Sequence, residues 1–325
     1  MKKKCWKNSF LLLPVLFLAA CSKEDSPAID YRSGMRDFVR LISERGRALH
    51  PGFIVIPQNG TALLTSDGTP TGNPESAYIQ SINGVGQEEL FYGYDNNDDQ
   101  ATPEPEHSQL LEMCRFARNQ GLSVLVTDYA FSSEKQLNAC ASCRAENFIS
   151  FVADHRDLDN IPSSPSPLTN SQNIDSLQQA QSFLYLISPD QFETKEQFID
   201  RLSQTGDDLL LIDLFFDEET QLTTTDLARL RVKPQGGTRK IICYMSIGEA
   251  EHYRWYWKTS WDAVQPSFIV AEDPYWTDNY FVRYWDKSWQ EIICGNNDSY
   301  LNRVINTGFD GVYLDLVSAY EYFEE

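Results

Sequence analysis

Short apolar runs alternate with amphipathic stretches along most of the chain. The apolar runs predict eight strands, at residues 53–57, 79–85, 122–128, 148–153, 183–187, 209–213, 240–246 and 311–315. Runs such as LLLID at 209–213 are apolar on both faces, as is typical of strands in a covered parallel sheet. The intervening stretches predict helices at 34–48, 107–120, 134–146, 194–204, 223–231 and 287–306. Eight βα units favour an α/β fold, the (β/α)8 TIM barrel.

Two stretches break this rhythm. Residues 160–180 are rich in Pro, Ser, Asn and Gln and have no apolar period, which is linker composition. This linker could divide two domains, but each side would then hold only four strands and an incomplete barrel. We therefore predict a single barrel over residues 27–325. Residues 266–286 contain a further apolar run, which we expect in a long loop after the 240–246 strand.

The two ends of the predicted barrel complement each other. The last strand lies in GFDGVYLDLVSAY at 308–320, and no long helix follows it before Glu325. The helix at 34–48 is preceded by no strand. Both observations are explained if the barrel is circularly permuted, so that the 34–48 helix covers the last strand and the 160–180 linker joins the ancestral ends.

The first 26 residues have the features of a lipoprotein signal peptide and tether. A basic start, Lys2 to Lys4, precedes an apolar segment at 10–20 that is too short to span a bilayer. The segment ends in Leu-Ala-Ala-Cys, which resembles a bacterial lipobox, so Cys21 is the expected lipidation site. The acidic residues that follow resemble a surface-export tag or form a plain solvated linker. We expect a lipid-anchored protein of the cell envelope, at the outer membrane or the surface.

The amino-acid composition narrows the range of possible ligands and binding partners. The chain has 47 acidic and 27 basic residues, a net charge of −20, which argues against nucleic acid. A negative field favours a cationic or neutral ligand, although the acidity could equally serve solubility alone. Cys140 and Cys143 form a lone CxxC motif without the further ligands that zinc needs. No nucleotide-binding glycine motif follows a strand, so we expect no cofactor and no metal, and a monomeric protein.

Polar side chains, most of them carboxylates and amides, follow almost every predicted strand. Because the carboxyl ends of barrel strands meet at one face, these side chains are expected to form a site. They are Gln58, Asn59, Glu88, Glu89, Asp128, Tyr129, Asp154, Arg156, Asp213, Glu249, Glu251 and Asp315. Eight aromatic residues crowd two of the loops and could stack on sugar rings or pack between loop and barrel: Trp255, Tyr256, Trp257, Tyr275, Trp276, Tyr280, Tyr284 and Trp285. Two carboxyl groups flanking a bond are the requirement for cleaving a glycoside, and no GxSxG or HExxH motif competes.

Several long motifs resemble those of glycoside hydrolase family 114, which is typified by endo-α-1,4-polygalactosaminidase. They are IICYMSIGEAEHYRWYW, DNYFVRYWDKSWQEII, GFDGVYLD, PGFIVIPQNG, INGVGQEELFYG and VADHRDLDNIP. In the family the last three follow GFDGVYLD, whereas here they precede it, which again indicates circular permutation. The resemblance implies a TIM-barrel endo-glycosidase that acts on an α-linked, polygalactosamine-like polysaccharide.

By the same resemblance, Asp315 and Glu88 end the fourth and sixth barrel strands, where related α-glycosidases carry their catalytic carboxylates. Asp315 is then expected to be the nucleophile or base and Glu88 the proton donor. The expected substrate-binding residues are Asp213, Glu249, Glu251, Gln58, Asn59, Asp128, Tyr129 and Tyr244.

Ser318 departs from the family pattern, which often has a second Asp there, and this keeps a non-catalytic glycan-binding lipoprotein open as an alternative. A hydrolase of neutral α-glucans is a further alternative. Adjacent residues of a strand point to opposite faces, so only one of Glu88 and Glu89 should enter the site. The sequence does not separate a retaining from an inverting mechanism.

Overall fold

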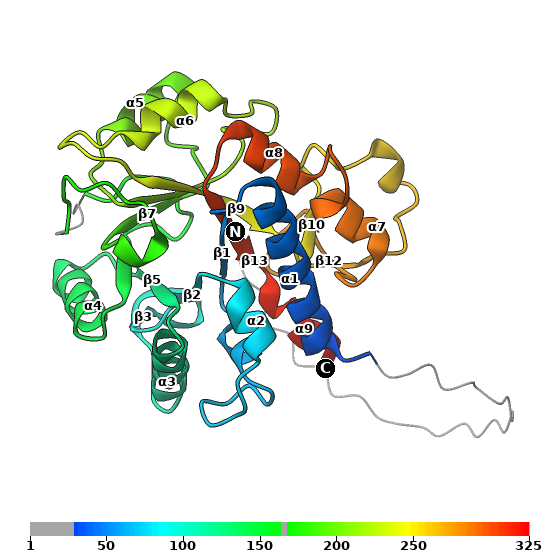
Figure 1. Cartoon of the computed structure of the whole chain (residues 1–325), viewed down its shortest axis with the longest axis horizontal. Helices are drawn as coiled ribbons and strands as arrows, with labels where there is room; N and C mark the ends of the chain where they lie inside the picture. Colours follow the sequence, from blue (N-terminus) through cyan, green and yellow to red (C-terminus); the bar gives the residue numbers. More distant parts are fainter. Residues whose placement is uncertain (1–28, 164–167, 325) are drawn as a thin grey trace, which may run out of the picture. The chain divides into compact units, whose positions relative to one another are not determined.

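Eight parallel strands close on themselves in the computed structural model, which describes residues 29–163 and 168–324 (Figure 1). In order around the barrel they are β1 (Ile54–Pro57), β2 (Gly84–Glu88), β5 (Ser123–Tyr129), β6 (Ile149–Ala153), β7 (Phe183–Leu186), β8 (Leu209–Ile212), β9 (Lys240–Ser246) and β13 (Gly311–Asp315). Continuous ladders join β1-β13-β9-β8-β7 and β2-β5-β6. Parallel bridges between Gln58 and Gly86 and between Ser150 and Ser182 close the two seams. The predicted α/β barrel fold is confirmed.

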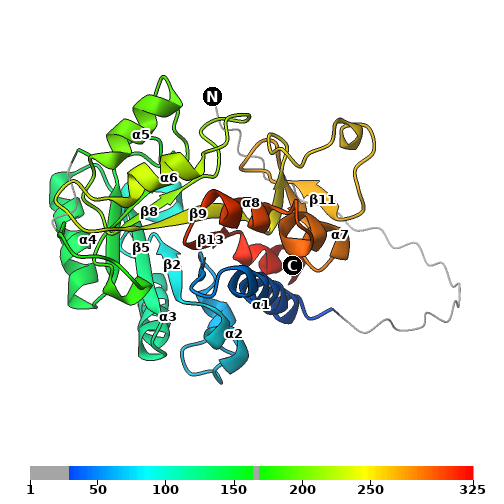
Figure 2. The same ribbon diagram turned by 45° about the horizontal axis from the view of Figure 1, so that its top comes forward.

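Helices surround the barrel (Figures 1 and 2). They are α1 (Tyr31–Leu49), α2 (Ser76–Ser81), α3 (Glu106–Asn119), α4 (Ser133–Ala145), α5 (Lys195–Ser203), α6 (Thr224–Arg231), α7 (Lys287–Gln290), α8 (Tyr300–Thr307) and α9 (Tyr320–Glu324). Helix α8 has a serine N-cap, Ser299, and ends at Gly308, whose φ of 101° is the left-handed conformation that glycine adopts without strain.

Helix α1 covers the β13 side of the barrel. It packs against α8, which precedes β13, and against α2, which follows β1. Its buried face includes Phe38 and Ile42, and the buried Arg36 donates to the carbonyl oxygens of Leu63 and Thr65. Helix α1 therefore occupies the position expected of the helix that covers the last strand. The permuted strand order relative to other proteins stays a prediction.

Three expected elements differ in the structure. The strand expected at 79–85 is wrong: residues 76–81 form α2, which buries Tyr78 and Ile79, and the strand begins at Gly84. The helix expected at 287–306 is interrupted by a π-helical turn at Glu291–Gly295 and by the loop before Ser299.

The long loop expected at 266–286 instead contributes two strands of a small antiparallel sheet. Strand β12 (Asn279–Val282) lies between β10 (Glu249–Glu251) and β11 (Ile269–Glu272). A two-stranded hairpin, β3 (Tyr92–Gly93) and β4 (Asn97–Ala101), follows β2. Both insertions come after strands whose ends bear predicted site residues.

The described part of the linker packs against the amino-terminal ends of the strands. Ile174 is buried, and its amide donates to the carbonyl oxygen of Thr238 at 2.9 Å. Asn170 donates to Asp208, the residue before β8, whose carboxylate also pairs with the fully buried Lys233 at 2.8 Å. The linker around residues 170–174 therefore lies on the barrel face opposite the carboxyl ends, whereas Asn160 and Ser163 contact Asp154 at the carboxyl end of β6.

Residues Tyr31–Glu325 form one compact unit. Cys21 and the rest of the expected leader lie outside the described residues, so their assignment stays a prediction. Within the part of the chain that the structure describes, no helix has both the length and the apolar character to cross a membrane.

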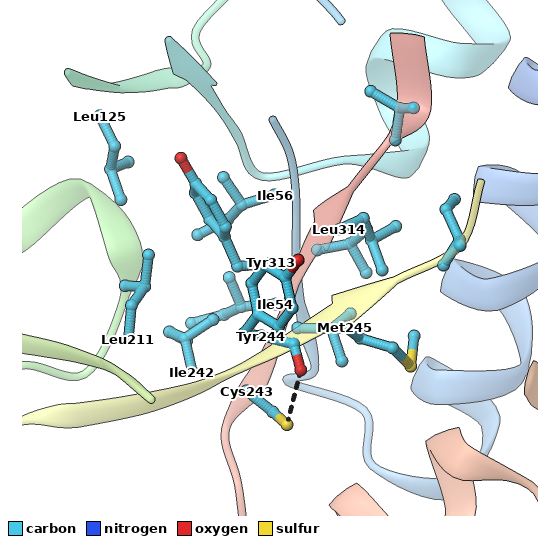
Figure 3. Close-up of a cluster of buried hydrophobic side chains, with 14 of the residues drawn as sticks. Ile54, Ile56, Leu125, Leu211, Ile242, Cys243, Tyr244, Met245, Tyr313 and Leu314 are labelled. Atoms are coloured by element: carbon cyan, nitrogen blue, oxygen red, sulfur yellow. Dashed lines mark hydrogen bonds between the residues drawn. The ribbon is translucent and has the colours of Figure 1, made fainter. Parts of the chain in front are cut away.

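Strand alternation decides what fills the barrel. Side chains of every second residue point inward, and Ile56, Leu211 and Ile242 belong to this buried set (Figure 3). Tyr313 is also inward, and its hydroxyl would lie 2.0 Å from a Cβ built on Gly86. A large residue on one strand is thus accommodated by a glycine on another.

We expect Gly86→Ala to lower the free energy of unfolding by about 1–3 kcal/mol, because the added methyl group overpacks the barrel against Tyr313. Urea denaturation of the variant measures this loss. Gly52→Ala is the matched control, since its nearest neighbouring atom would lie 3.8 Å away. Equal stability of the two variants would contradict the tight fit.

Candidate active site

A cavity of about 970 Å³ lies at the carboxyl ends of the strands. Residues from the ends of all eight strands, or from the loops that follow them, line it. The lining includes nine of the ten residues that we expected to be catalytic or to bind substrate: Gln58, Asn59, Glu88, Tyr129, Asp213, Tyr244, Glu249, Glu251 and Asp315. Alternation explains the convergence, because each catalytic candidate stands two residues beyond an inward-facing core residue: Glu88 beyond Gly86 and Asp315 beyond Tyr313.

Both carboxylate oxygens of Glu88 are held by donors. Oε2 accepts a hydrogen bond from Asn59 Nδ2 at 2.7 Å, and Oε1 accepts a hydrogen bond from the Tyr129 hydroxyl. The amide of Glu88 donates to Asn59 Oδ1 at 2.9 Å, so one amide side chain fixes both the backbone and the carboxylate. Glu88 is therefore held in a single orientation toward the cavity by neighbouring strands.

Asp315 is the last residue of β13. Its Oδ2 accepts from the Tyr244 hydroxyl at 2.6 Å and its Oδ1 from the Leu316 amide at 2.7 Å. The surrounding protein removes water from this carboxyl group, and this desolvation, with repulsion from Glu88, raises the pKa of Asp315 to about 7.

Asp213 and Glu251 share one buried cation. Arg254 Nη1 lies 2.8 Å from Asp213 Oδ2, and Arg254 Nε lies 2.7 Å from Glu251 Oε2. All three side chains are nearly inaccessible, and Tyr253 also donates to Glu251 at 2.6 Å. Sequence analysis did not single out Arg254. Its contacts make Asp213 and Glu251 parts of a fixed ionic wall of the cavity.

Glu249 differs from these two carboxylates because no arginine compensates it. Burial and a hydrogen bond shared with Asp273 raise the pKa of Glu249 to about 9, so it is protonated at neutral pH. Its Oε2 lies 3.3 Å from Asn279 Nδ2, which connects β10 to β12. The neutral acid joins the small sheet to the cavity wall.

Arg156 is the second cation of the cavity wall. It pairs with Glu89 at 2.7 Å and with Asp98 at 3.0 Å. Its guanidinium lies 4.0 Å from the centre of the Tyr129 ring, behind the hydroxyl that donates to Glu88. Glu89 has a left-handed φ of 55° and pairs with Arg156, yet it lines the cavity together with Glu88, which corrects the expectation that only one of them enters the site.

Asp128 does not line the cavity, which corrects the expectation that it contacts substrate. Its carboxylate is fully buried, and Oδ1 accepts hydrogen bonds from the amides of Phe91 and Tyr92 at 2.8 and 2.9 Å. It stands between Thr127 and Tyr129 on β5, and Tyr129 lines the cavity, so alternation directs Asp128 outward. Its contacts anchor the start of the β3–β4 hairpin.

Comparison with known proteins identifies the second half of the barrel. The model of glycoside-hydrolase family GH114 matches residues 175–325. This stretch, a little under half of the chain, is therefore similar to family GH114. The matched region begins just before β7 and includes β8, β9 and β13, and therefore Asp213, Glu249, Glu251 and Asp315. Family GH114 is a TIM-barrel family, in agreement with the strand order.

The chain is also similar to three uncharacterized proteins. One from Thermotoga maritima is 48% identical over 84 residues, which is 26% of this chain and 25% of that protein. One from Deinococcus radiodurans is 42% identical over 114 residues, 35% of this chain and 34% of its own length. One from Methanocaldococcus jannaschii is 34% identical over 184 residues, 55% of this chain and 49% of its own length. The chain thus spans between a quarter and a half of the length of these relatives.

Asp315→Asn is expected to stabilise the protein at pH 8 by on the order of 1–3 kcal/mol. The pKa of Asp315 is raised, so the folded state binds its proton more tightly than the unfolded state. Ionised Asp315 therefore lowers stability progressively as the pH rises from about 4 to about 7. Urea denaturation at pH 5 and pH 8 should show a gain that grows with pH.

Asp217→Asn is the control for this effect. Despite some desolvation, hydrogen bonds from Thr220 lower the pKa of the exposed Asp217. Its substitution should bring no gain in stability at pH 8. A gain equal to that of Asp315→Asn would show that loss of net negative charge, and not the local environment of Asp315, causes the effect.

Arg254→Met should destabilise the protein by about 3–5 kcal/mol, because it leaves Asp213 and Glu251 buried without their cation. Arg229→Met is a matched control: Arg229 is exposed and pairs with Glu196 and Asp200 at the surface, where ion pairs contribute about 0–1 kcal/mol. Similar losses in urea denaturation would contradict the structural role of the buried triad.

Proposed function

We propose that this protein is a glycoside hydrolase that cleaves an α-linked amino-sugar polymer from within, using Asp315 and Glu88. Similarity to family GH114 supports glycoside hydrolysis. The single observation that carries the substrate class is the charge of the cavity. Among the described residues that line it, thirteen are Asp or Glu and two are Arg, with no Lys or His. Both arginines are already paired with carboxylates.

A cavity of this composition favours a cationic ligand. Low-dielectric walls concentrate the field of the uncompensated carboxylates, so ammonium groups are attracted and anionic polymers are repelled. An α-linked galactosamine polymer carries one amine on each sugar, which matches a cavity lined by acids over several strand ends. Neutral α-glucans would gain none of this attraction and are the weaker candidate.

The two carboxyl groups divide the chemistry. Asp315 attacks the anomeric carbon or activates water, and Glu88 protonates the leaving glycosidic oxygen. The hydroxyls of Tyr244 and Tyr129 hold these groups in orientation. Burial and repulsion from Glu88 raise the pKa of Asp315 to about 7, so Asp315 must lose its proton before it attacks carbon or activates water.

Cleavage of galactosamine oligosaccharides by the purified protein, followed by mass spectrometry, tests the function. We expect Asp315→Asn and Glu88→Gln each to reduce cleavage at least about 1,000-fold while the protein stays folded, because glycosidases lose most of their rate without either carboxyl group. Binding of oligosaccharides without any product from the native protein would instead establish the non-catalytic alternative. Full activity in both variants would reject the catalytic pair.

A substrate whose leaving group needs no proton distinguishes the proton donor from the other carboxyl group. A pH profile reports how many protons the active form carries, and not which carboxyl group carries a proton. The pH dependence alone therefore does not assign the roles of the two acids. In a dinitrophenyl glycoside of an amino-sugar oligosaccharide, the leaving group is dinitrophenolate, which departs without needing a proton. In the first turnover, Glu88→Gln should release dinitrophenolate nearly as fast as the native protein, whereas Asp315→Asn should not. The reverse result would exchange the two roles.

We further propose that the enzyme is held at the cell envelope by a lipid on Cys21. The basic start, short apolar segment and Leu-Ala-Ala-Cys ending of the leader support this location. An envelope position would bring the barrel to polymers outside the cytoplasm.

A further inference from the structure

We propose that Trp276 is a sugar-binding subsite at the mouth of the cavity, where it stacks on a pyranose ring of an amino-sugar chain that extends beyond the cleavage point. This inference rests on the proposed function. It concerns a residue outside the barrel strands, on the connection between β11 and β12 (Asp273 to Asp278), and not the carboxylates at the strand ends.

The structure separates the aromatic residues of these loops by exposure. Tyr256 and Tyr284 are buried, and Trp257 and Trp285 pack against other rings at centroid distances of 5.3 Å or less. Only two of the eight in the described chain are largely exposed: Tyr275 at 86% and Trp276 at 58%. These two have the most ring surface left to cover.

Position then distinguishes the two exposed rings. Trp276 lines the cavity, whereas its neighbour Tyr275 does not. A single exposed aromatic residue is ordinary on a protein surface. An exposed indole on the wall of the acidic cavity is different, because a ligand bound in the cavity can contact it. Trp255 also lines the cavity, but the guanidinium of Arg303 already lies over its ring, 3.7 Å from the centroid.

The backbone that carries Trp276 is fixed by hydrogen bonds. The carboxylate of Asp273 accepts from the Tyr275 amide at 2.7 Å, and the Asp273 amide donates to the Asn279 carbonyl oxygen at 2.7 Å. The Asn279 amide donates to the carbonyl oxygen of Trp276 at 3.2 Å. The turn belongs to the small sheet, which lies on the α7 side of the barrel (Figures 1 and 2). Because the turn is ordered before a ligand arrives, stacking on the indole loses little conformational entropy.

The chemistry of the indole fits the proposed polymer. Its face covers the apolar face of a pyranose ring, and its negative quadrupole attracts an ammonium group placed above it. Asn279, which ends the turn, also lines the cavity and offers an amide to sugar hydroxyls. The exposure of Trp276 places it at the cavity mouth, so it would contact only chains long enough to reach from the cleavage point to the rim.

Calorimetric titration tests the subsite without interference from cleavage when it is carried out in an Asp315→Asn background. In that background Trp276→Ala should weaken binding of a galactosamine hexasaccharide about tenfold, the size of one lost stacking or cation–π contact. Binding of the disaccharide should be unchanged. Trp276→Phe should restore most of the affinity, and Tyr275→Ala, which removes an exposed ring outside the cavity, should leave both affinities unchanged.

Two results would reject the subsite while leaving the proposed function in place. One is unchanged hexasaccharide binding by Trp276→Ala; the other is an equal loss for the disaccharide and the hexasaccharide. If the Asp315→Asn parent binds no amino-sugar oligosaccharide, the proposed function fails and the subsite fails with it. Thermal denaturation of each variant confirms that the fold is retained, as expected for a surface substitution.

Discussion

Closure of the parallel sheet is the constraint on which the rest of the molecule depends. Bridges at Gln58–Gly86 and Ser150–Ser182 join the two ladders and turn two sheets into one barrel. Closure removes exposed sheet edges and brings the ends of eight strands to one face. At the first seam, Gln58 and Gly86 lie next to Asn59 and Glu88, so the contact that closes the barrel also orients a catalytic candidate.

The barrel interior connects packing to chemistry. The ring of Tyr313 fills the space that Gly86 leaves, and its edge packs against Tyr185 with a centroid distance of 5.4 Å. Asp315 stands two residues after Tyr313 on its strand, and Glu88 stands two residues after Gly86, so both side chains also point inward. The core therefore fixes the floor of the cavity, and the hydrogen bonds from Tyr244, Tyr129 and Asn59 then set the orientation of the two acids.

So many carboxyl groups in one cavity would repel one another if all were charged and free. The structure limits this repulsion in two ways. Arg254 and Arg156 each bridge two carboxylates, and Glu249 keeps its proton through its contact with Asp273. What remains is a net negative cavity around Asp315 and Glu88, which the amine of a substrate would help to balance. Under the proposed function, this arrangement would give the acidity of the chain a local function beyond solubility.

The sequence by itself determined the barrel and seven of its eight strands, and nine of the ten residues that we expected to act on substrate line the cavity. The apolar pattern of a strand is local, and the carboxyl ends of parallel strands meet at one face of a barrel. Apolar runs followed by acidic residues were therefore sufficient to predict both the strands and the site. It failed at 79–85, because a short apolar run suits either a helix or a strand, and only packing beneath α1 selects α2.

Tertiary structure alone decided how the polar residues are paired. Arg254 stands three residues after Glu251 and far in sequence from Asp213, and Arg156 is 67 residues from Glu89, so their bridges depend on strand ends meeting in space. Nor could sequence separate Trp276 from the buried aromatics around it, because exposure is a property of the assembled sheet. The types and approximate positions of the strands and helices follow from local patterns in the sequence. The partners, charge states and solvent exposure of the side chains follow from closure of the barrel.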